Sequence, residues 1–270
     1  MAKIESAFFD LSYLEDLANR QSTIHRLDPR IKVIIAALFV VCVVSFDKYI
    51  ISAMLPFVLL LVVVMGIADI PAGYMLKKLL FVSPFAIMVG IFNPLLDQQP
   101  VLHIGVLTLT GGWLSFLSIL LRFSLTVSAM LILVATTGFN TVCLAMVRLG
   151  MPKIFAVQLL LLYRYIFVLI DEGLRMYQAR ALRSFKKAGM DMKTFGHMAG
   201  RLLLRTLDRA QRIHLAMLCR GFDGTIRISR PLQLGGQDFA ALLGGTAILL
   251  LMRCYDLPAI FGRFLTGIAS

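Results

Sequence analysis

Residues 113–137 read WLSFLSILLRFSLTVSAMLILVATT, and this apolar run decides the class of the protein. A helix that spans a bilayer needs about 20 predominantly apolar residues. Residues 113–137 exceed that length with one charged side chain, Arg122, inside the run. The run therefore predicts a long membrane span that is interrupted by a single arginine.

The composition of the whole chain agrees with a membrane protein. Of the 270 residues, 59% are hydrophobic and 16% are charged, and the mean hydropathy is +0.84. Soluble domains have about 45–50% apolar and about 25% charged residues. We expect an all-α membrane protein with about five transmembrane helices, several of them short for a bilayer core of about 30 Å. The four further apolar blocks are 31–46, 49–67, 79–92 and 239–252.

Local signals mark the start of the first of these helices. Asp28 is a favoured N-cap residue and Pro29 is favoured in the first turn, so we expect the helix to begin there. Before it, Phe8, Leu11, Leu14 and Ala18 recur at helical spacing, which predicts a short amphipathic segment. The predicted domains are an N-terminal amphipathic segment (1–30), four membrane helices (31–137), a coupling domain (138–234), and the last membrane helix with the C-terminus (235–270).

The positive charge is concentrated in the third of these domains. Residues 138–234 hold sixteen Lys and Arg against five Asp and Glu, a net charge of +11 out of the +12 of the whole chain. Loops rich in Lys and Arg stay on the cytoplasmic side of a membrane. We therefore predict that this domain and the N-terminus are cytoplasmic and that the protein is a multi-pass protein of a bacterial or archaeal cell membrane.

The block 154–170 complicates this topology because it is apolar and almost long enough to cross. If it crossed, Arg164 would lie in the middle of the bilayer, which costs roughly 2.5–3.5 kcal/mol on insertion scales. The basic stretch after it would also lie outside. We predict a helix that is buried against other helices near the inner face, with the crossing left open.

Two long amphipathic helices follow in the basic domain. Gly150-Met151-Pro152 ends one helix and starts another, which carries an apolar stripe from Leu174 to Ala188. A second helix is expected from Met192 to Arg220. The residues expected to pack the two helices are Leu174, Tyr177, Phe185, Leu203, Ala210 and Met217.

Each of these helices has an arginine near its far end, Arg180 in the first and Arg220 in the second. An Arg-Gly pair at a helix end is often only a C-cap that is favoured by the helix dipole. Basic faces beside membranes also bind anionic lipid, at about 1 kcal/mol per charge. From the residues alone, a cap, a lipid contact and a docking site for a partner protein remain open. Nothing in the pattern points to nucleic acid.

The stretch 216–224, AMLCRGFDG, resembles the second signature of the T components of energy-coupling factor transporters, Ala-Met-x-Ala-Arg-Gly-(Phe/Tyr). The stretch 177–184, YQARALRS, looks like their first signature, which is built around Ala-Arg-Gly, and 25–32, HRLDPRIK, is similar to the start of their first span. The resemblance covers most of the chain in order and spacing and is closest to the cobalt branch, CbiQ. Two departures are Cys219 in place of alanine and Ala181 in place of glycine.

The resemblance implies a scaffold. A T component joins a substrate-binding membrane subunit to two cytoplasmic ABC-type ATPase subunits. The resemblance implies that the membrane subunit is CbiM-like, alone or together with a CbiN-like protein, and that the ATPase subunits are CbiO-like. ATP and magnesium are bound by those ATPases, and no cofactor is expected in this chain. The positions that would dock on the ATPases are Ala179, Arg180, Ala181, Cys219, Arg220 and Gly221.

The chain lacks the residues for chemistry of its own. Its four histidines are far apart in the sequence, so we predict no metal site. It has no Gly-rich phosphate-binding loop that ends in Lys-Ser or Lys-Thr, and no nucleophile–base motif, which excludes recognisable ATPase and hydrolase classes. The alternatives are a T component for nickel or a vitamin and, from another class, a self-sufficient secondary transporter, which would need more ionisable residues in its spans than Arg122.

Overall fold

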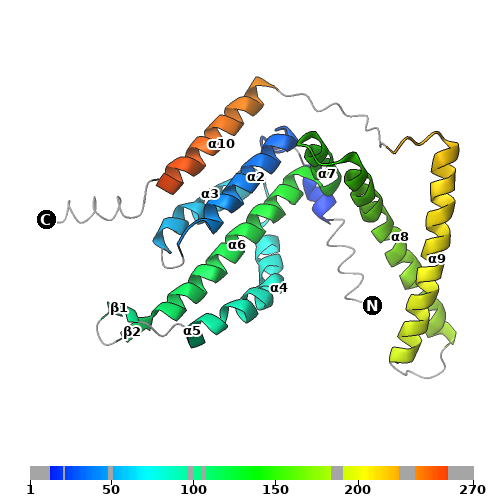
Figure 1. Cartoon of the computed structure of the whole chain (residues 1–270), viewed down its shortest axis with the longest axis horizontal. Coiled ribbons are helices and arrows are strands. Elements are labelled where there is room, and N and C mark those ends of the chain that lie inside the picture. Colours follow the sequence, from blue (N-terminus) through cyan, green and yellow to red (C-terminus); the bar gives the residue numbers. More distant parts are fainter. Residues whose placement is uncertain are drawn as a thin grey trace. The chain divides into compact units, whose positions relative to one another are not determined.

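The computed structural model describes residues 13–20, 22–47, 51–96, 100–104, 107–183, 191–224 and 235–254, and nearly all of these residues are helical (Figure 1). The chain divides into two compact units. One, which we call the bundle unit, comprises Leu14–Val142 and Leu232–Ser270. The other, the α8–α9 unit, is built mainly from Cys143–Pro231.

The bundle unit contains most of the membrane helices. Its elements are α2 (Pro29–Val44), the 3₁₀ turn η1 (Ser52–Met54), α3 (Leu55–Ile67), α4 (Ala72–Gly90), α5 (Phe92–Leu96), β1 (Pro100–Ile104), β2 (Leu107–Thr110), α6 (Gly111–Thr137) and α10 (Gly236–Cys254). Helix α7 (Phe139–Arg148) leads to the other unit, which holds α8 (Lys153–Arg183) and α9 (Met192–Cys219).

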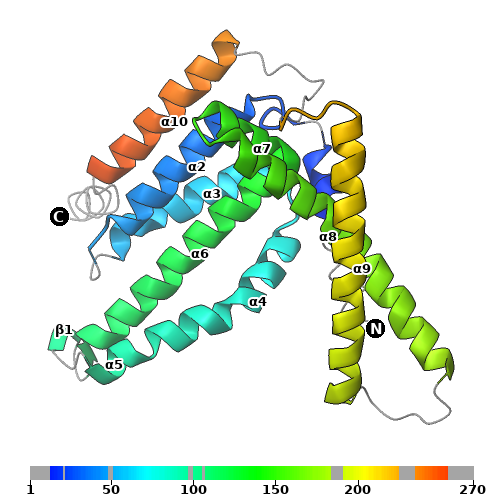
Figure 2. The same cartoon turned by 45° about the vertical axis from the view of Figure 1, so that its right-hand side comes forward.

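Helix α6 is the centre of the bundle unit and packs against α2, α3, α4 and α5. Helix α10, although last in the sequence, lies against α2, as both views show (Figures 1 and 2). A small residue permits this close approach, because a Cβ at Gly245 of α10 would lie 3.0 Å from Ile35 Cδ1 of α2. The first and last membrane helices are therefore neighbours.

An aromatic cluster closes the core between α2 and α3. Phe57 of α3 is fully buried, and its ring meets Phe39 and Phe46 edge-on at centroid distances of 5.6 and 5.5 Å. Edge-to-face pairs of this kind are worth about 0.5–1.5 kcal/mol beyond the burial of their area. The α2–α3 hairpin is therefore held by its own side chains.

All five predicted membrane helices exist, with shifted boundaries. The block 49–67 becomes a shorter helix that begins at Leu55, where Pro56 occupies the first turn. The block 79–92 begins seven residues earlier than predicted, at Ala72. Among the described residues, four helices are long and apolar enough to cross a membrane: 72–94, 111–137, 153–183 and 236–254. At 16 and 13 residues, α2 and α3 are shorter than a full crossing requires.

Two features differ from the sequence-based expectation. The connection 93–112, which has no Lys or Arg, contains a short antiparallel β-hairpin, β1–β2, where no strand was predicted. The block 154–170 was predicted to be buried against other helices, and within this chain that prediction is wrong. Of the whole of α8, only Ala156 is buried. Ile154, Phe155 and Leu162 are more than half exposed, and most of its other apolar side chains are half-buried.

Candidate docking helices

Helices α8 and α9 cross and contact each other, as predicted for the basic domain (Figure 2). One ion pair joins them, in which Arg205 of α9 donates from Nη1 to Glu172 Oε1 of α8. The pair was missed because its partners lie 33 residues apart and nothing in the pattern links them.

The far end of α9 has the geometry of a Schellman cap. The N–H of Phe222 donates to the Met217 carbonyl and the N–H of Gly221 donates to the Leu218 carbonyl, both at 3.0 Å. Gly221 has φ +75°, a conformation that side-chain-bearing residues rarely adopt. Gly221 is therefore explained by the backbone alone. Arg220 is the C-cap residue, and its side chain is not required for that turn.

The cap fixes the place at which Arg220 is presented. Arg220 is exposed; its backbone N–H donates to the Met217 carbonyl, and its side chain makes no hydrogen bond or ion pair with another described residue. Cys219, the preceding predicted docking residue, is exposed as well. The end of α9 therefore offers an unpaired guanidinium on a rigid turn.

The other predicted docking position lies inside a helix rather than at its end. Arg180 is half-buried in the last described turn of α8, between the exposed residues Ala179 and Ala181. Helix α8 continues to Arg183, and residues 184–190 lie outside the described part. Arg180 and Arg220 therefore differ in local structure, although the sequence presents them as a matched pair.

The predicted packing residues of the two helices divide into two sets. Leu174, Tyr177 and Met217 are half-buried, whereas Leu203 and Ala210 are exposed. Phe185 lies outside the described residues. The half-buried positions of α9 that the structure adds to this set are Thr194, Met198, Leu202, Thr206 and Ile213.

Helix α9 also carries a second apolar stripe that the sequence reading missed. Leu204, Leu207, Leu215 and Leu218 lie at spacings of three, eight and three, which places them on one helical face. Each is at least 50% exposed, and α9 has no buried residue at all. A helix that is apolar on two sides is usually covered on both. We therefore expect a partner protein or a lipid surface to cover this stripe.

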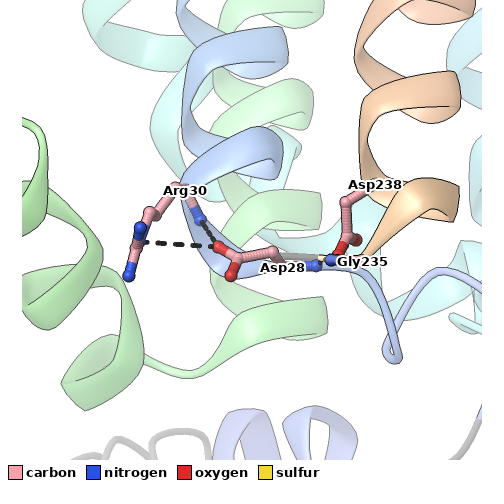
Figure 3. Close-up of polar contacts among 4 residues, drawn as sticks. All are labelled: Asp28, Arg30, Gly235 and Asp238. Carbon is pink, nitrogen blue, oxygen red and sulfur yellow. Dashed lines mark hydrogen bonds and ion pairs between the residues drawn. The ribbon is translucent and has the colours of Figure 1, made fainter. Parts of the chain in front are cut away.

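A second candidate region, in the bundle unit, is built around the start of α2 (Figure 3). Asp28 is the N-cap of α2, and its Oδ1 accepts the Arg30 N–H at 2.8 Å, as the sequence predicted for a cap. The Asp28 N–H in turn donates to Asp238 Oδ1 of α10, also at 2.8 Å, and Asp238 Oδ2 accepts the N–H of Gly235 at 2.9 Å. One carboxylate thus binds the starts of two helices.

A buried lysine completes this region. The Lys32 ammonium donates to the carbonyl of Thr136 at the end of α6 and to that of His25, at 3.1 and 3.2 Å. Asp28, Lys32 and Asp238 are 5%, 8% and 8% exposed. We call Asp28, Lys32, Thr136 and Asp238 the anchor cluster. No sequence pattern predicted it, because Asp28 and Asp238 are 210 residues apart.

His25 borders the anchor cluster and makes contacts through both ring nitrogens. Its Nδ1 meets the Ser22 hydroxyl at 2.8 Å and its Nε2 meets the Leu17 carbonyl at 3.1 Å. Burial, with the nearby Lys32 and Arg20, lowers the pKa of His25 below its ordinary value. The ring therefore donates from Nε2 and accepts at Nδ1, which fits a structural role.

The intramembrane arginine Arg122 has a different setting. Its Nε and Nη2 atoms are buried and make no hydrogen bond with any described residue. Across the described ranges, no three side chains of His, Cys, Asp or Glu lie close enough together to hold a metal ion.

The chain is similar to a family model and to relatives from other organisms. Residues 20–231 match a family model named CbiQ and described as a cobalt transport protein. An uncharacterized protein of Methanocaldococcus jannaschii is 27% identical over 254 residues, which cover 90% of this chain and 86% of that relative. A protein of Methanocorpusculum labreanum, named as a fused cobalt transport protein CbiMQ, is 29% identical over 36% of this chain and 16% of its own length.

Proposed function

The chain belongs to the CbiQ family of cobalt transport proteins, and from that premise we propose that it is the membrane scaffold, or T component, of an ATP-driven cobalt importer. It is a multi-pass membrane protein with several helices long enough to cross the bilayer. In the proposed role it binds neither cobalt nor ATP. It couples subunits that do, and its N-terminus and α8–α9 unit face the cytoplasm.

The observation that carries this proposal is the end of α9. A long amphipathic helix without a buried residue ends in a rigid cap that presents the unpaired Arg220. A guanidinium has five donors in a planar fork, which suits carboxylates and backbone carbonyls of a partner groove. We propose that Arg220, with Cys219 and Gly221, docks on one ABC-type ATPase subunit.

A second ATPase subunit is proposed for the end of α8. At this end the half-buried Arg180 lies between two exposed residues, Ala179 and Ala181. Because Arg180 lies within the helix, its guanidinium reaches a partner from the side of α8 rather than from a capped end. We therefore expect this contact to be the weaker of the two. ATP and magnesium belong to the ATPases in this proposal.

The remaining partner is a substrate-binding membrane subunit. The fused relative named CbiMQ supports a CbiM-like protein in this position, because a fusion places both parts in one chain. The CbiM-like subunit acts alone or together with a CbiN-like protein. Anionic lipid would contact the basic surface of the α8–α9 unit. The family name favours cobalt over nickel or a vitamin as the cargo.

The direct test is the association of the ATPase with charge-reversed variants. Arg220→Glu should lower the amount of ATPase that copurifies by at least about 30-fold, the loss expected for a hot-spot arginine. Membrane insertion should be unchanged. Arg180→Glu should lower the amount of copurifying ATPase less than Arg220→Glu does.

The matched control is Arg212→Glu, which makes the same charge change on an exposed position of the same helix, about two turns earlier. It should copurify with the ATPase at the wild-type level. Wild-type association of the Arg220→Glu variant, or equal losses in both variants, would contradict docking at the end of α9.

A further inference from the structure

Arg122 of α6 and Asp47, which lies just beyond the end of α2, are at the same level of the bundle unit. Helices α2 and α6 pack against each other, and Lys32 near the start of α2 binds the Thr136 carbonyl near the end of α6, so the two helices run antiparallel. Counted from this bond, Asp47 lies 15 residues further along the chain and Arg122 lies 14 residues back. At 1.5 Å per residue, both are about 21–23 Å from the anchor cluster along the helix axes.

This level lies inside the membrane. The hydrocarbon core is about 30 Å thick, so a helix pair that starts at one boundary is still about 7–9 Å short of the other boundary at this level. Helix α2, of 16 residues, ends near it, and α3, of 13 residues, begins near it. A charged side chain inside the core is costly unless it is paired. Arg122 and Asp47 therefore each need a partner.

The Arg122 guanidinium has no partner on the edge that carboxylates bind. Its Nε and Nη2 atoms are buried and form no hydrogen bond with any described residue. These two atoms share one edge of the planar fork, and a carboxylate binds such an edge through two parallel hydrogen bonds. Ser115 and Ser118 lie on the same face of α6, and their hydroxyls are buried and unbonded as well. This face of α6 therefore offers several unpaired donors to a carboxylate.

Few carboxylates of the chain can reach that edge. Between the starts of α2 and α8, the sequence has three acidic residues: Asp47, Asp69 and Asp97. Asp69 follows the far end of α3, about 20 Å along that helix, where its carbonyl accepts a hydrogen bond from Arg20. Asp97 lies outside the described residues. Asp47 is exposed, makes no ion pair with a described residue, and acts electrostatically on the Arg122 guanidinium.

We propose that Asp47 is the counter-ion of Arg122 in the bilayer, and that this pair latches the turn between α2 and α3 to α6. The pairing removes two costs at once, because neither a carboxylate nor a guanidinium is then left alone in hydrocarbon. It also accounts for the short α2 and α3, whose polar turn ends on a charge of α6 instead of reaching the far interface. The inference concerns the membrane part of the chain and does not rest on the proposed coupling role.

Arg253, at the end of α10, is a matched arginine whose partners are already in place. It donates from Nη2 to the Ser45 carbonyl at 2.9 Å, and its guanidinium lies 4.2 Å from the centroid of the Phe46 ring. Both of these partners are within two residues of Asp47. Arg253 therefore lies beside the same turn but is satisfied without a carboxylate, and the effect of its replacement should not depend on Asp47.

The first experiment is a double-mutant cycle on the unfolding of the full chain in phosphatidylcholine bicelles. Asp47→Asn leaves Arg122 unpaired in the bilayer and should lower the equilibrium constant for folding by at least about tenfold. Arg122→Leu, added to that variant, should recover most of the loss because no charge is then left alone. Exchange of the two charges, by Asp47→Arg with Arg122→Asp, should also recover it. The control Arg253→Leu should have the same effect in the wild type and in the Asp47→Asn variant.

Three results of this cycle would contradict the latch. Additive effects of Asp47→Asn and Arg122→Leu, within about twofold, would overturn the proposal. Recovery of the Asp47→Asn loss by Arg253→Leu, and not by Arg122→Leu, would assign Asp47 to the wrong arginine. Coupling of Arg122→Leu to Asp97→Asn or Asp256→Asn, at two acidic residues outside the described part of the chain, would assign another counter-ion and overturn the proposal as well.

A second experiment needs no substitution and therefore does not depend on how well a variant folds. Solid-state NMR of the full chain in phosphatidylcholine vesicles measures the distance from Arg122 Cζ to Asp47 Cγ. A bidentate pair should place these two carbons about 4 Å apart. A distance above about 6 Å in the bilayer is too long for any direct pair and would overturn the proposal.

Discussion

The bundle unit and the α8–α9 unit differ in how much of their apolar surface is buried within this chain. The bundle unit has fully buried side chains such as Phe57, Met54 and Val43, and its buried Asp238 and Lys32 are hydrogen-bonded to groups of the same unit. Helix α9 has no buried residue, and the described polar link to α8 is the exposed pair of Arg205 and Glu172. The difference indicates that the bundle unit has a packed core of its own, whereas α9 depends on other molecules to cover its apolar stripes.

The largest effect is expected at Phe57. Phe57→Ala removes a fully buried ring that contacts two others, and it should lower the free energy of unfolding by about 3–5 kcal/mol. Detergent-driven unfolding of the purified chain measures this change. The matched change on α9, Leu207→Ala, should stay within about 0.5 kcal/mol because Leu207 is exposed in the isolated chain. Similar losses at both positions would remove the contrast between the units.

The next effect concerns the buried charge of the bundle unit. Lys32→Met should destabilise the chain by about 2–4 kcal/mol, because it leaves two carbonyls and the Asp28 carboxylate without their cation. The same unfolding assay applies, with Lys77→Met on the exposed surface of α4 as the control. A Lys32 variant as stable as the wild type would show that the anchor cluster does not hold the bundle unit.

A smaller effect is expected at the cap of α9. Gly221→Ala forces a residue with a Cβ into φ +75° and should cost about 1–2 kcal/mol in that turn. Hydrogen exchange at residues 217–222 should become faster. Gly200→Ala, in the middle of α9 where a Cβ meets no atom within 4 Å, should instead stabilise the helix by up to about 1 kcal/mol. Equal exchange in both variants would contradict the cap.

The smallest effect is expected for the ion pair between α8 and α9. Glu172→Gln should cost about 0.2–1 kcal/mol, and less at high salt, because Arg205 is mostly exposed. A double-mutant cycle with Arg205→Gln isolates the pair. A coupling energy well above this range would mean that α8 and α9 hold each other without partners.

Local signals in the sequence predicted the helix boundaries well where the boundary has a local cause. Asp28 and Pro29 begin α2 as predicted, and the cap hydrogen bond to Arg30 is present. Gly150, with φ +112°, ends α7, and α8 begins directly after Pro152. The predicted helix from Met192 to Arg220 is α9 with Arg220 as its C-cap. In each case one or two residues determine the backbone geometry.

Contacts between distant residues could not be predicted in this way. The bond from Asp28 to Asp238 and the pair of Glu172 with Arg205 depend on how helices pack, and packing leaves no periodic pattern in either segment. The exposed surface of α8 was misjudged for a related reason. An apolar run looks the same whether its own chain, a lipid or a partner covers it. The docking residues at the ends of α8 and α9 stay predictions.

The central claim, that the α8–α9 unit docks on the ATPase and the core of the bundle unit does not, is tested most directly by hydrogen exchange with and without the ATPase. On complex formation, peptides that cover residues 217–222 at the end of α9 should become protected. Peptides around Lys32 and Thr136 should exchange at the same rate in both states. Unchanged exchange at the end of α9, with new protection confined to the bundle unit, would contradict the account.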